Sequence, residues 1–169
     1  MNKRFGYLLL IILFGFFNKS FGQESVTFAL RDSQELKMDI YLGEADVKQP
    51  ETIIYVFGGG FMFGSKEDSI SVDYCRKMQE RGFTTIAIDY RLGMKGKKLR
   101  GLEFVKAMEE SIGMAVEDLT SAVVYLINNG SRWGIDASRI VTTGASAGAI
   151  IVSEADYSHA IGKLSLIHI

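Results

Sequence analysis

The stretch "VTTGASAGAI" at residues 141–150 decides how the chain is interpreted, because it joins a β-branched run to an Ala- and Ile-rich run. Between the two runs, Ser146 stands in the pattern G-x-S-x-G, flanked by Gly144 and Gly148. A sharp turn from a strand into a helix needs flanking positions without side chains, and it points the serine hydroxyl outward. The pattern therefore predicts that Ser146 is a nucleophile. The alternative is a Gly/Ala-rich turn that serves packing alone.

The surrounding segments predict strands that alternate with helices. Two stretches of alternating apolar and polar residues, 25–32 and 34–42, indicate an antiparallel hairpin at a sheet edge. Apolar runs then predict buried strands at 52–57, 83–89 and 138–143, and helical spacing predicts helices at 68–82, about 103–129 and 146–160. In the first helix, Ile70, Tyr74 and Met78 recur at helical spacing. This order predicts an α/β fold with a mostly parallel, doubly wound sheet.

A second glycine-rich stretch, "VFGGGFMFGS" at 56–65, follows a predicted buried strand. Its spacing fits neither a phosphate-binding loop nor a dinucleotide-binding loop, both of which need a helix or a lysine at fixed positions. A backbone bare of side chains lets the amides of Gly59 and Gly60 approach a substrate oxygen. Together with the amide of Ala147 at the start of the last helix, they are the predicted oxyanion hole. A flexible turn is the alternative.

Three motifs in this order carry a family resemblance. "FGGGF" at 57–61, "DYRL" at 89–92 and "GASAG" at 144–148 are similar to motifs of α/β-hydrolase esterases of the hormone-sensitive-lipase and acetyl-esterase type. The resemblance implies an α/β-hydrolase fold and a serine carboxylesterase that cleaves short-acyl esters, acetyl esters among them, through an acyl-enzyme. The family loop usually reads H-G-G-G, and Phe57 stands at the place of that histidine. This departure puts the anchoring of the loop in question.

Two other functions stay open beside the esterase. One is a peptidase on the same fold, and the other is a non-catalytic binding protein that kept the fold without the catalytic triad. The "DYRL" motif also has a structural interpretation, in which Asp89 and Arg91 pair with each other near the end of a strand.

The partners of Ser146 are not found in the sequence. In this fold the triad runs in chain order Ser, then Asp or Glu, then His, with the last two on later loops. Glu154, Asp156 and His159 follow Ser146, but all three lie on the predicted helix that begins at the serine. A side chain 13 residues down a helix is about 20 Å away. We therefore expect that this chain lacks the acid and the His of the triad and is inactive as it stands.

The two ends of the chain are expected to lie outside the fold. Residues 1–22 carry Lys3 and Arg4, then an apolar core, then small residues before Gln23, a pattern typical of a secretory signal peptide. Residues 23–163 are interpreted as the N-terminal part of an α/β-hydrolase domain, truncated after the elbow. The tail "LSLIHI" at 164–169, which includes His168, resembles a translated sequencing adapter, so we expect it to be non-native. The location predicted from this pattern is periplasmic or secreted.

Composition excludes several classes of partner. The chain of 169 residues has 19 basic and 20 acidic residues and a net charge of −1, so no broad basic field is present to hold nucleic acid. Its single cysteine, Cys75, and two histidines do not predict a metal site, and no cofactor is expected. The basic loop "KGKKLR" at 95–100 is interpreted as solvated. Small-molecule or saccharide esters are the expected partners, with no stable membrane insertion after signal cleavage.

Overall fold

A computed structural model describes residues 23–44 and 48–160, and the predictions for the signal peptide and for the 164–169 tail lie outside these residues. The described chain forms one five-stranded sheet in the order β1-β2-β4-β3-β5. Its strands are β1 Gln23–Arg31, β2 Gln34–Tyr41, β3 Thr52–Val56, β4 Thr84–Ile88 and β5 Ile140–Gly144. The pairs β1/β2 and β2/β4 are antiparallel, and β4/β3 and β3/β5 are parallel. The predicted hairpin and parallel strands are both confirmed.

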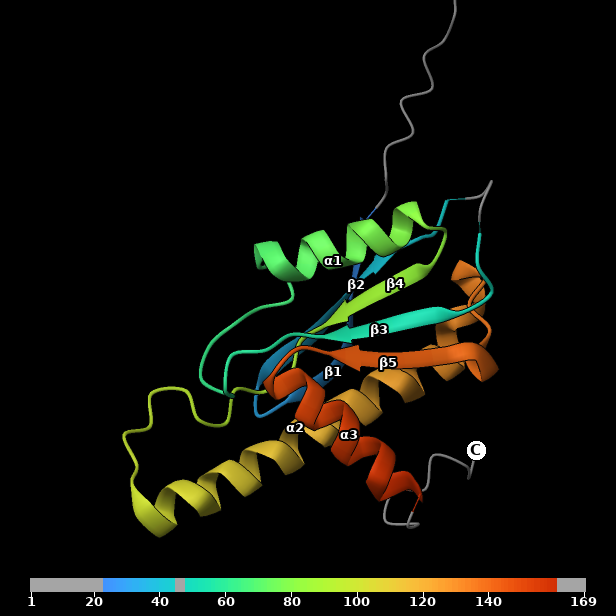
Figure 1. The fold of residues 1–169 in the computed structure, drawn as a ribbon. Helices are drawn as coiled ribbons and strands as arrows, with labels where there is room; N and C mark the ends of the chain where they lie inside the picture. The colour runs from blue at the N-terminus through green and yellow to red at the C-terminus, as the bar shows by residue number, and fades with distance from the viewer. Residues whose placement is uncertain (1–22, 45–47, 161–169) are drawn as a thin grey trace, which may run out of the picture.

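Helices cover both faces of this sheet. They are α1 Ser69–Glu80, α2 Gly101–Asn129 and α3 Ala147–Ala160, and two short 3₁₀ turns, η2 Gly130–Trp133 and η3 Ala137–Arg139, join α2 to β5. Figure 1 shows α1 on one side of the sheet and α2 and α3 on the other, which confirms the predicted doubly wound arrangement. Of the helices described, none is both long and apolar enough to cross a membrane.

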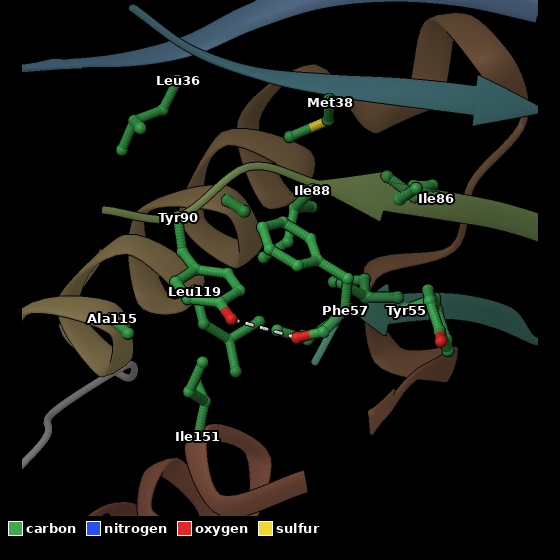
Figure 2. Packing of buried hydrophobic residues seen from close by; sticks show 14 of the residues in the cluster. Leu36, Met38, Tyr55, Phe57, Ile86, Ile88, Tyr90, Ala115, Leu119 and Ile151 are labelled. Atoms are coloured by element: carbon green, nitrogen blue, oxygen red, sulfur yellow. Dashed lines mark hydrogen bonds between the residues drawn. The ribbon is translucent and has the colours of Figure 1, made fainter. Parts of the chain in front are cut away.

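The hairpin β1/β2 closes through a turn of two residues, Asp32 and Ser33, both with positive φ (48° and 65°). Such angles match the right-handed twist of the strands that a two-residue turn connects. On β2 the side chains of Leu36, Met38 and Ile40 are fully buried, so this strand is the one through which the hairpin joins the core. In Figure 2, Leu36 and Met38 lie above the packed side chains of β4 and β3.

The buried face of α1 differs from the predicted one. Ile70 is 71% exposed, and the fully buried positions are Ser71, Cys75 and Gln79. The sheet below α1 explains the rotation, because β2 presents polar groups there. Asp39 is buried, and the Gln79 amide donates a hydrogen bond to the main-chain oxygen of Leu42 (2.9 Å). Small and polar side chains of the helix fit such a surface better than a row of large apolar ones.

The strand predicted at 138–143 is present as β5, but it is less buried than predicted. β5 lies at the edge of the described sheet, where it pairs with β3 alone, and Val141 is 49% exposed. An edge strand keeps one side of its backbone unpaired, so its residues here are only half-buried.

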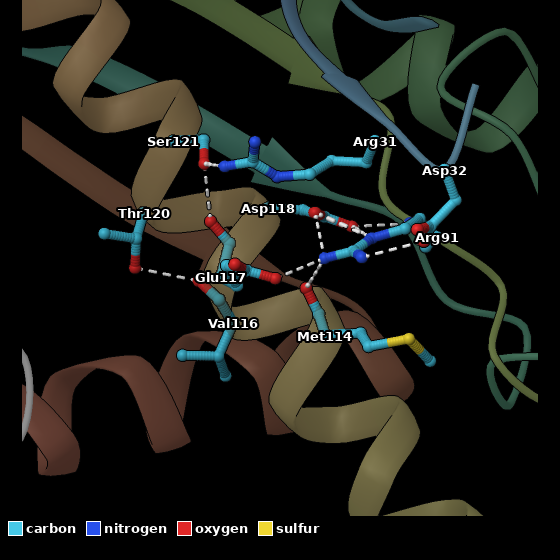
Figure 3. A network of polar contacts seen from close by, with 9 residues as sticks. All are labelled: Arg31, Asp32, Arg91, Met114, Val116, Glu117, Asp118, Thr120 and Ser121. Atoms are coloured by element: carbon cyan, nitrogen blue, oxygen red, sulfur yellow. Dashed lines mark hydrogen bonds and ion pairs between the residues drawn. The ribbon is translucent and has the colours of Figure 1, made fainter. Parts of the chain in front are cut away.

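An ionic network ties the end of β4 to α2 (Figure 3). The Arg91 guanidinium donates from Nε to both oxygens of Asp118 (3.0 Å each), and its other nitrogens contact Glu117 and Asp32. Asp118 is fully buried and also accepts from the Arg91 main-chain N–H (2.8 Å). Asp89 instead exchanges two hydrogen bonds with Lys37 of β2. The interpretation in which Asp89 and Arg91 pair with each other is therefore wrong.

Loss of the Asp118 charge is expected to destabilise the fold strongly. Asp118→Asn leaves the largely buried Arg91 guanidinium without its buried counterion. We therefore expect the free energy of unfolding to fall by about 2–4 kcal/mol. Urea denaturation measures this change. The matched control is Asp73→Asn, which breaks an exposed pair with Lys77 on α1 and should cost less than about 0.5 kcal/mol. Equal effects of the two substitutions would contradict the network's role.

The reactivity of the Cys75 thiol tests whether α1 packs on the sheet in solution. Burial raises the pKa of Cys75 to about 12, and the side chain is fully enclosed between α1 and the sheet. A thiol reacts with disulfide reagents as its thiolate. We therefore expect no reaction with Ellman's reagent near pH 8 in the folded protein and prompt reaction of the single thiol in guanidinium chloride. Reaction of the folded protein at the rate of free glutathione would show that α1 is not packed as described.

Candidate active site

The turn between β5 and α3 presents Ser146 to solvent. Ser146 has a φ of 52° and is exposed, whereas Ala147 and Gly148 directly after it are buried. A left-handed conformation in a residue with a side chain costs of order 1–3 kcal/mol, and such residues cluster at functional sites. The Ser146 carbonyl accepts from the N–H groups of Ala149 (2.9 Å) and Ile150 (3.1 Å), so the serine forms the first turn of the helix. This geometry is that of a nucleophile elbow.

Contacts with backbone atoms explain why both flanking positions are glycine. A Cβ at Gly144 would lie 2.4 Å from the main-chain carbon of Gly148, and a Cβ at Gly148 would lie 2.1 Å from the carbonyl oxygen of Val56. Both distances are far below van der Waals contact, and the neighbouring atoms are backbone and cannot move aside. The turn is therefore sharp because α3 begins directly against β5 and the end of β3.

The glycine loop after β3 lies against this elbow. A Cβ at Gly58 would lie 2.8 Å from the carbonyl oxygen of Ala145 and 3.2 Å from the Cβ of Ser146. The two motifs that the sequence singled out, separated by more than 80 positions, are thus neighbours in space. Gly58 itself was not among the predicted site residues, although it is the glycine that touches the serine.

Gly59 and Gly60 form the next turn of the loop. Both have positive φ (130° and 60°), and the Gly59 carbonyl accepts from the N–H groups of Met62 (3.0 Å) and Phe63 (3.2 Å). Among the described residues, no acceptor is recorded for the N–H groups of Gly59, Gly60 or Ala147. These amides are consistent with donors held for a ligand oxygen. Their assignment as the oxyanion hole stays a prediction.

Phe57 anchors the loop in a way the sequence did not reveal. Its ring is buried and stacks on the ring of Tyr90 (centroids 4.4 Å apart), and its carbonyl accepts from the Tyr90 hydroxyl (3.1 Å). Figure 2 shows both contacts. The ring of Phe61 meets Tyr90 edge-on (6.2 Å), and its carbonyl accepts from the N–H of Met94 (3.0 Å). Tyr90 of the "DYRL" segment therefore holds the loop at Phe57, the position at which the family loop usually has a histidine.

A buried ion pair fixes the far end of the loop. Lys66 Nζ lies 2.8 Å from Asp39 of β2, and both side chains are nearly inaccessible (3% and 1% exposed). Burial alone would lower the pKa of Lys66, but hydrogen bonds to Asp39 and Glu67 raise it above its usual value. Burial also raises the pKa of nearby Asp89. Sequence analysis missed this pair, because nothing in the pattern marks a lysine and an aspartate 27 residues apart as neighbours.

Within residues 23–44 and 48–160, no histidine lies beside Ser146. His159 lies in the last turn of α3, about 20 Å from the start of a helix of this length by its rise per residue. Glu154 and Asp156 are exposed on the same helix. Over residues 23–44 and 48–160, no cluster of side chains is suited to hold a metal ion. The described residues thus form an exposed serine beside a glycine loop, and none of them supplies an acid or a base to it.

Comparison with known proteins agrees with this geometry. The family model BD-FAE matches residues 38–164, a span that includes the second half of β2, the strands that follow it, the glycine loop and the elbow. The chain belongs to the BD-FAE family. The resemblance to α/β-hydrolase serine esterases is thereby confirmed, and with it the fold class.

Relatives of this BD-FAE member are esterases. The apo form of Thermogutta terrifontis esterase 2 superposes with a TM-score of 0.62 at 25% identity, over 78% of this chain and 45% of that one. Other structures of that esterase are described as butyrate bound or as phosphorylated by paraoxon. A probable isoprenylcysteine alpha-carbonyl methylesterase (ICMEL1) of Oryza sativa subsp. japonica is 28% identical over 69% of this chain and 24% of its own length. The chain thus spans less than half of the solved esterase and about a quarter of the rice protein.

The BD-FAE elbow should not tolerate a methyl group at its second glycine. Gly148→Ala forces Val56 and α3 apart, so we expect the free energy of unfolding to fall by about 1–3 kcal/mol or more. Thermal or urea unfolding measures it. The control is Gly113→Ala in the middle of α2, where no atom lies within 4 Å of the added Cβ. That substitution should raise stability by about 0.5–1 kcal/mol. A harmless Gly148→Ala would refute the described contact.

Proposed function

We propose that the protein is a secreted serine carboxylesterase that hydrolyses short-acyl esters through an acyl-enzyme on Ser146. The observation that carries this proposal is the position of Ser146: exposed, in a left-handed conformation, and directly beside the glycine loop. Membership of an esterase family supports the reaction class. The signal-like N-terminal pattern supports export to the periplasm or the exterior.

In the proposed reaction, the Ser146 hydroxyl attacks the ester carbonyl and its proton passes to a histidine base. Charge develops on the carbonyl oxygen, where the amides of Gly59, Gly60 and Ala147 stabilise it, each by about 3–4 kcal/mol in the transition state. The alcohol leaves and water then hydrolyses the acyl-enzyme. His159 lies too far along α3 to serve as the base, so the acid and the base come from outside the described residues.

The acyl group is proposed to be small. The esterase from Thermogutta terrifontis has been solved with butyrate and with propionate bound, and this chain is 25% to 27% identical to it. Acetyl esters of small molecules or saccharides are the substrates we propose for an exported enzyme of this kind. No cofactor takes part in the reaction as proposed.

Replacement of Ser146 tests the proposal directly. In the protein expressed from its complete gene, Ser146→Ala should lower kcat for p-nitrophenyl acetate and butyrate by about 10⁴-fold or more, because no other group replaces the nucleophile. The control Ser153→Ala, at an exposed position of α3, should leave kcat unchanged. Turnover that survives Ser146→Ala would refute the assignment.

Covalent labelling separates the esterase from the other candidate functions. Paraoxon should add one diethylphosphoryl group to Ser146, detected by mass spectrometry, in the wild-type protein and not in Ser146→Ala, because only an activated serine attacks phosphorus. Absence of the adduct in the wild type would favour a non-catalytic binding protein. Hydrolysis of peptide p-nitroanilides in preference to esters would favour a peptidase.

A further inference from the structure

Tyr90 contacts the glycine loop at a peptide that also lies against the nucleophile elbow. Its hydroxyl donates to the carbonyl oxygen of Phe57 (3.1 Å), and both residues are buried. Among the described residues, no main-chain N–H is recorded as a donor to this oxygen. The Tyr90 hydroxyl is thus the hydrogen-bond donor to this buried carbonyl oxygen. Its removal leaves the oxygen buried without a hydrogen bond, which costs free energy.

The Phe57 carbonyl lies at the junction of three elements. A Cβ at Gly148 would lie 2.7 Å from this oxygen, so the carbonyl touches the first turn of α3. The residue that follows, Gly58, makes the contact with Ala145 and Ser146 described above. The end of β3, the start of α3 and Tyr90, two residues after β4, therefore meet at the Phe57–Gly58 peptide. A shift of this peptide moves the loop relative to the serine.

Because the peptide unit is planar, this single hydrogen bond restricts the orientation of the loop that follows. A peptide unit is planar, and its C=O and N–H point in opposite directions. When Tyr90 holds the Phe57 carbonyl, it therefore also fixes the direction of the Gly58 N–H and the plane from which Gly59 and Gly60 continue. These two glycines have conformations that no side chain restricts. Without a fixed starting plane, the loop has several orientations of similar energy.

We propose that Tyr90 is a positioning residue for the nucleophile site: its hydroxyl sets the orientation of the loop amides at 58–60 relative to Ser146. The effect on kcat that this inference predicts rests on the proposed function. The effect on the orientation of the loop rests on geometry alone. Burial raises the pKa of Tyr90 far above its usual value, so the hydroxyl keeps its proton and stays a donor. Stacking of the Phe57 ring holds the tyrosine ring but does not orient the peptide.

Hydrogen exchange and kinetics of matched variants test this role in the protein expressed from its complete gene. Tyr90→Phe removes the hydroxyl and keeps the ring. Tyr41→Phe is the control, because the Tyr41 hydroxyl is equally buried but makes no hydrogen bond in the described structure. In Tyr90→Phe we expect exchange of the Met62 and Phe63 amides, which donate to the Gly59 carbonyl, to rise about tenfold, with β4 and α2 unchanged, and in Tyr41→Phe little change.

The kinetic arm uses p-nitrophenyl butyrate. Tyr90→Phe should lower kcat by about 10-fold to 100-fold with KM within about twofold, since misplaced groups weaken transition-state binding more than substrate binding. Two results would overturn the proposal: exchange in the loop equal to that of Tyr41→Phe, or a rise in exchange spread equally over β4 and α2. If Ser146→Ala shows that the proposed esterase is wrong, the exchange measurement still decides whether Tyr90 orients the loop.

Discussion

The site depends on the absence of side chains where three backbone segments meet. The carbonyls of Val56 and Phe57 lie so close to Gly148 that the first turn of α3 fits here only because this position has no Cβ. Because α3 starts there, the chain between β5 and α3 must reverse within a few residues, and Ser146 takes a left-handed conformation. Gly58 then approaches the serine from the other side. Each of these positions is constrained by backbone atoms, which cannot repack as side chains do.

Polar side chains outside the elbow stabilise this arrangement, and three of them belong to consecutive residues. Asp89 joins β4 to β2 through Lys37, Tyr90 reaches the glycine loop, and Arg91 pairs with Asp118 of α2. Neighbouring residues in an extended segment point in different directions, so one short motif ties three separate elements together. The buried pair of Lys66 and Asp39 adds a fourth tie, from the loop to the N-terminal hairpin.

Local patterns were sufficient to predict most of the fold and the two main motifs of the site. Helices, strands and the elbow follow from periodicity and from glycines at fixed spacing, and these signals depend on residues close in sequence. The buried face of α1 depends on neighbours distant in sequence, such as Asp39 below α1. For the same reason the roles of Gly58, Lys66 and Tyr90 were not predicted. Only "DYRL" carried a signal for one of them, and its local interpretation led to the wrong pair.

The conformation of Ser146 has a consequence for the evolution of such chains. A serine at a φ of 52° is less stable there than a glycine, which adopts this angle freely. Folding stability and chemistry therefore favour different residues at this position. Under the proposed reaction, selection for chemistry would keep the serine, and release from that selection would favour its replacement by glycine. The residue at the elbow would then record whether a lineage has kept the proposed reaction.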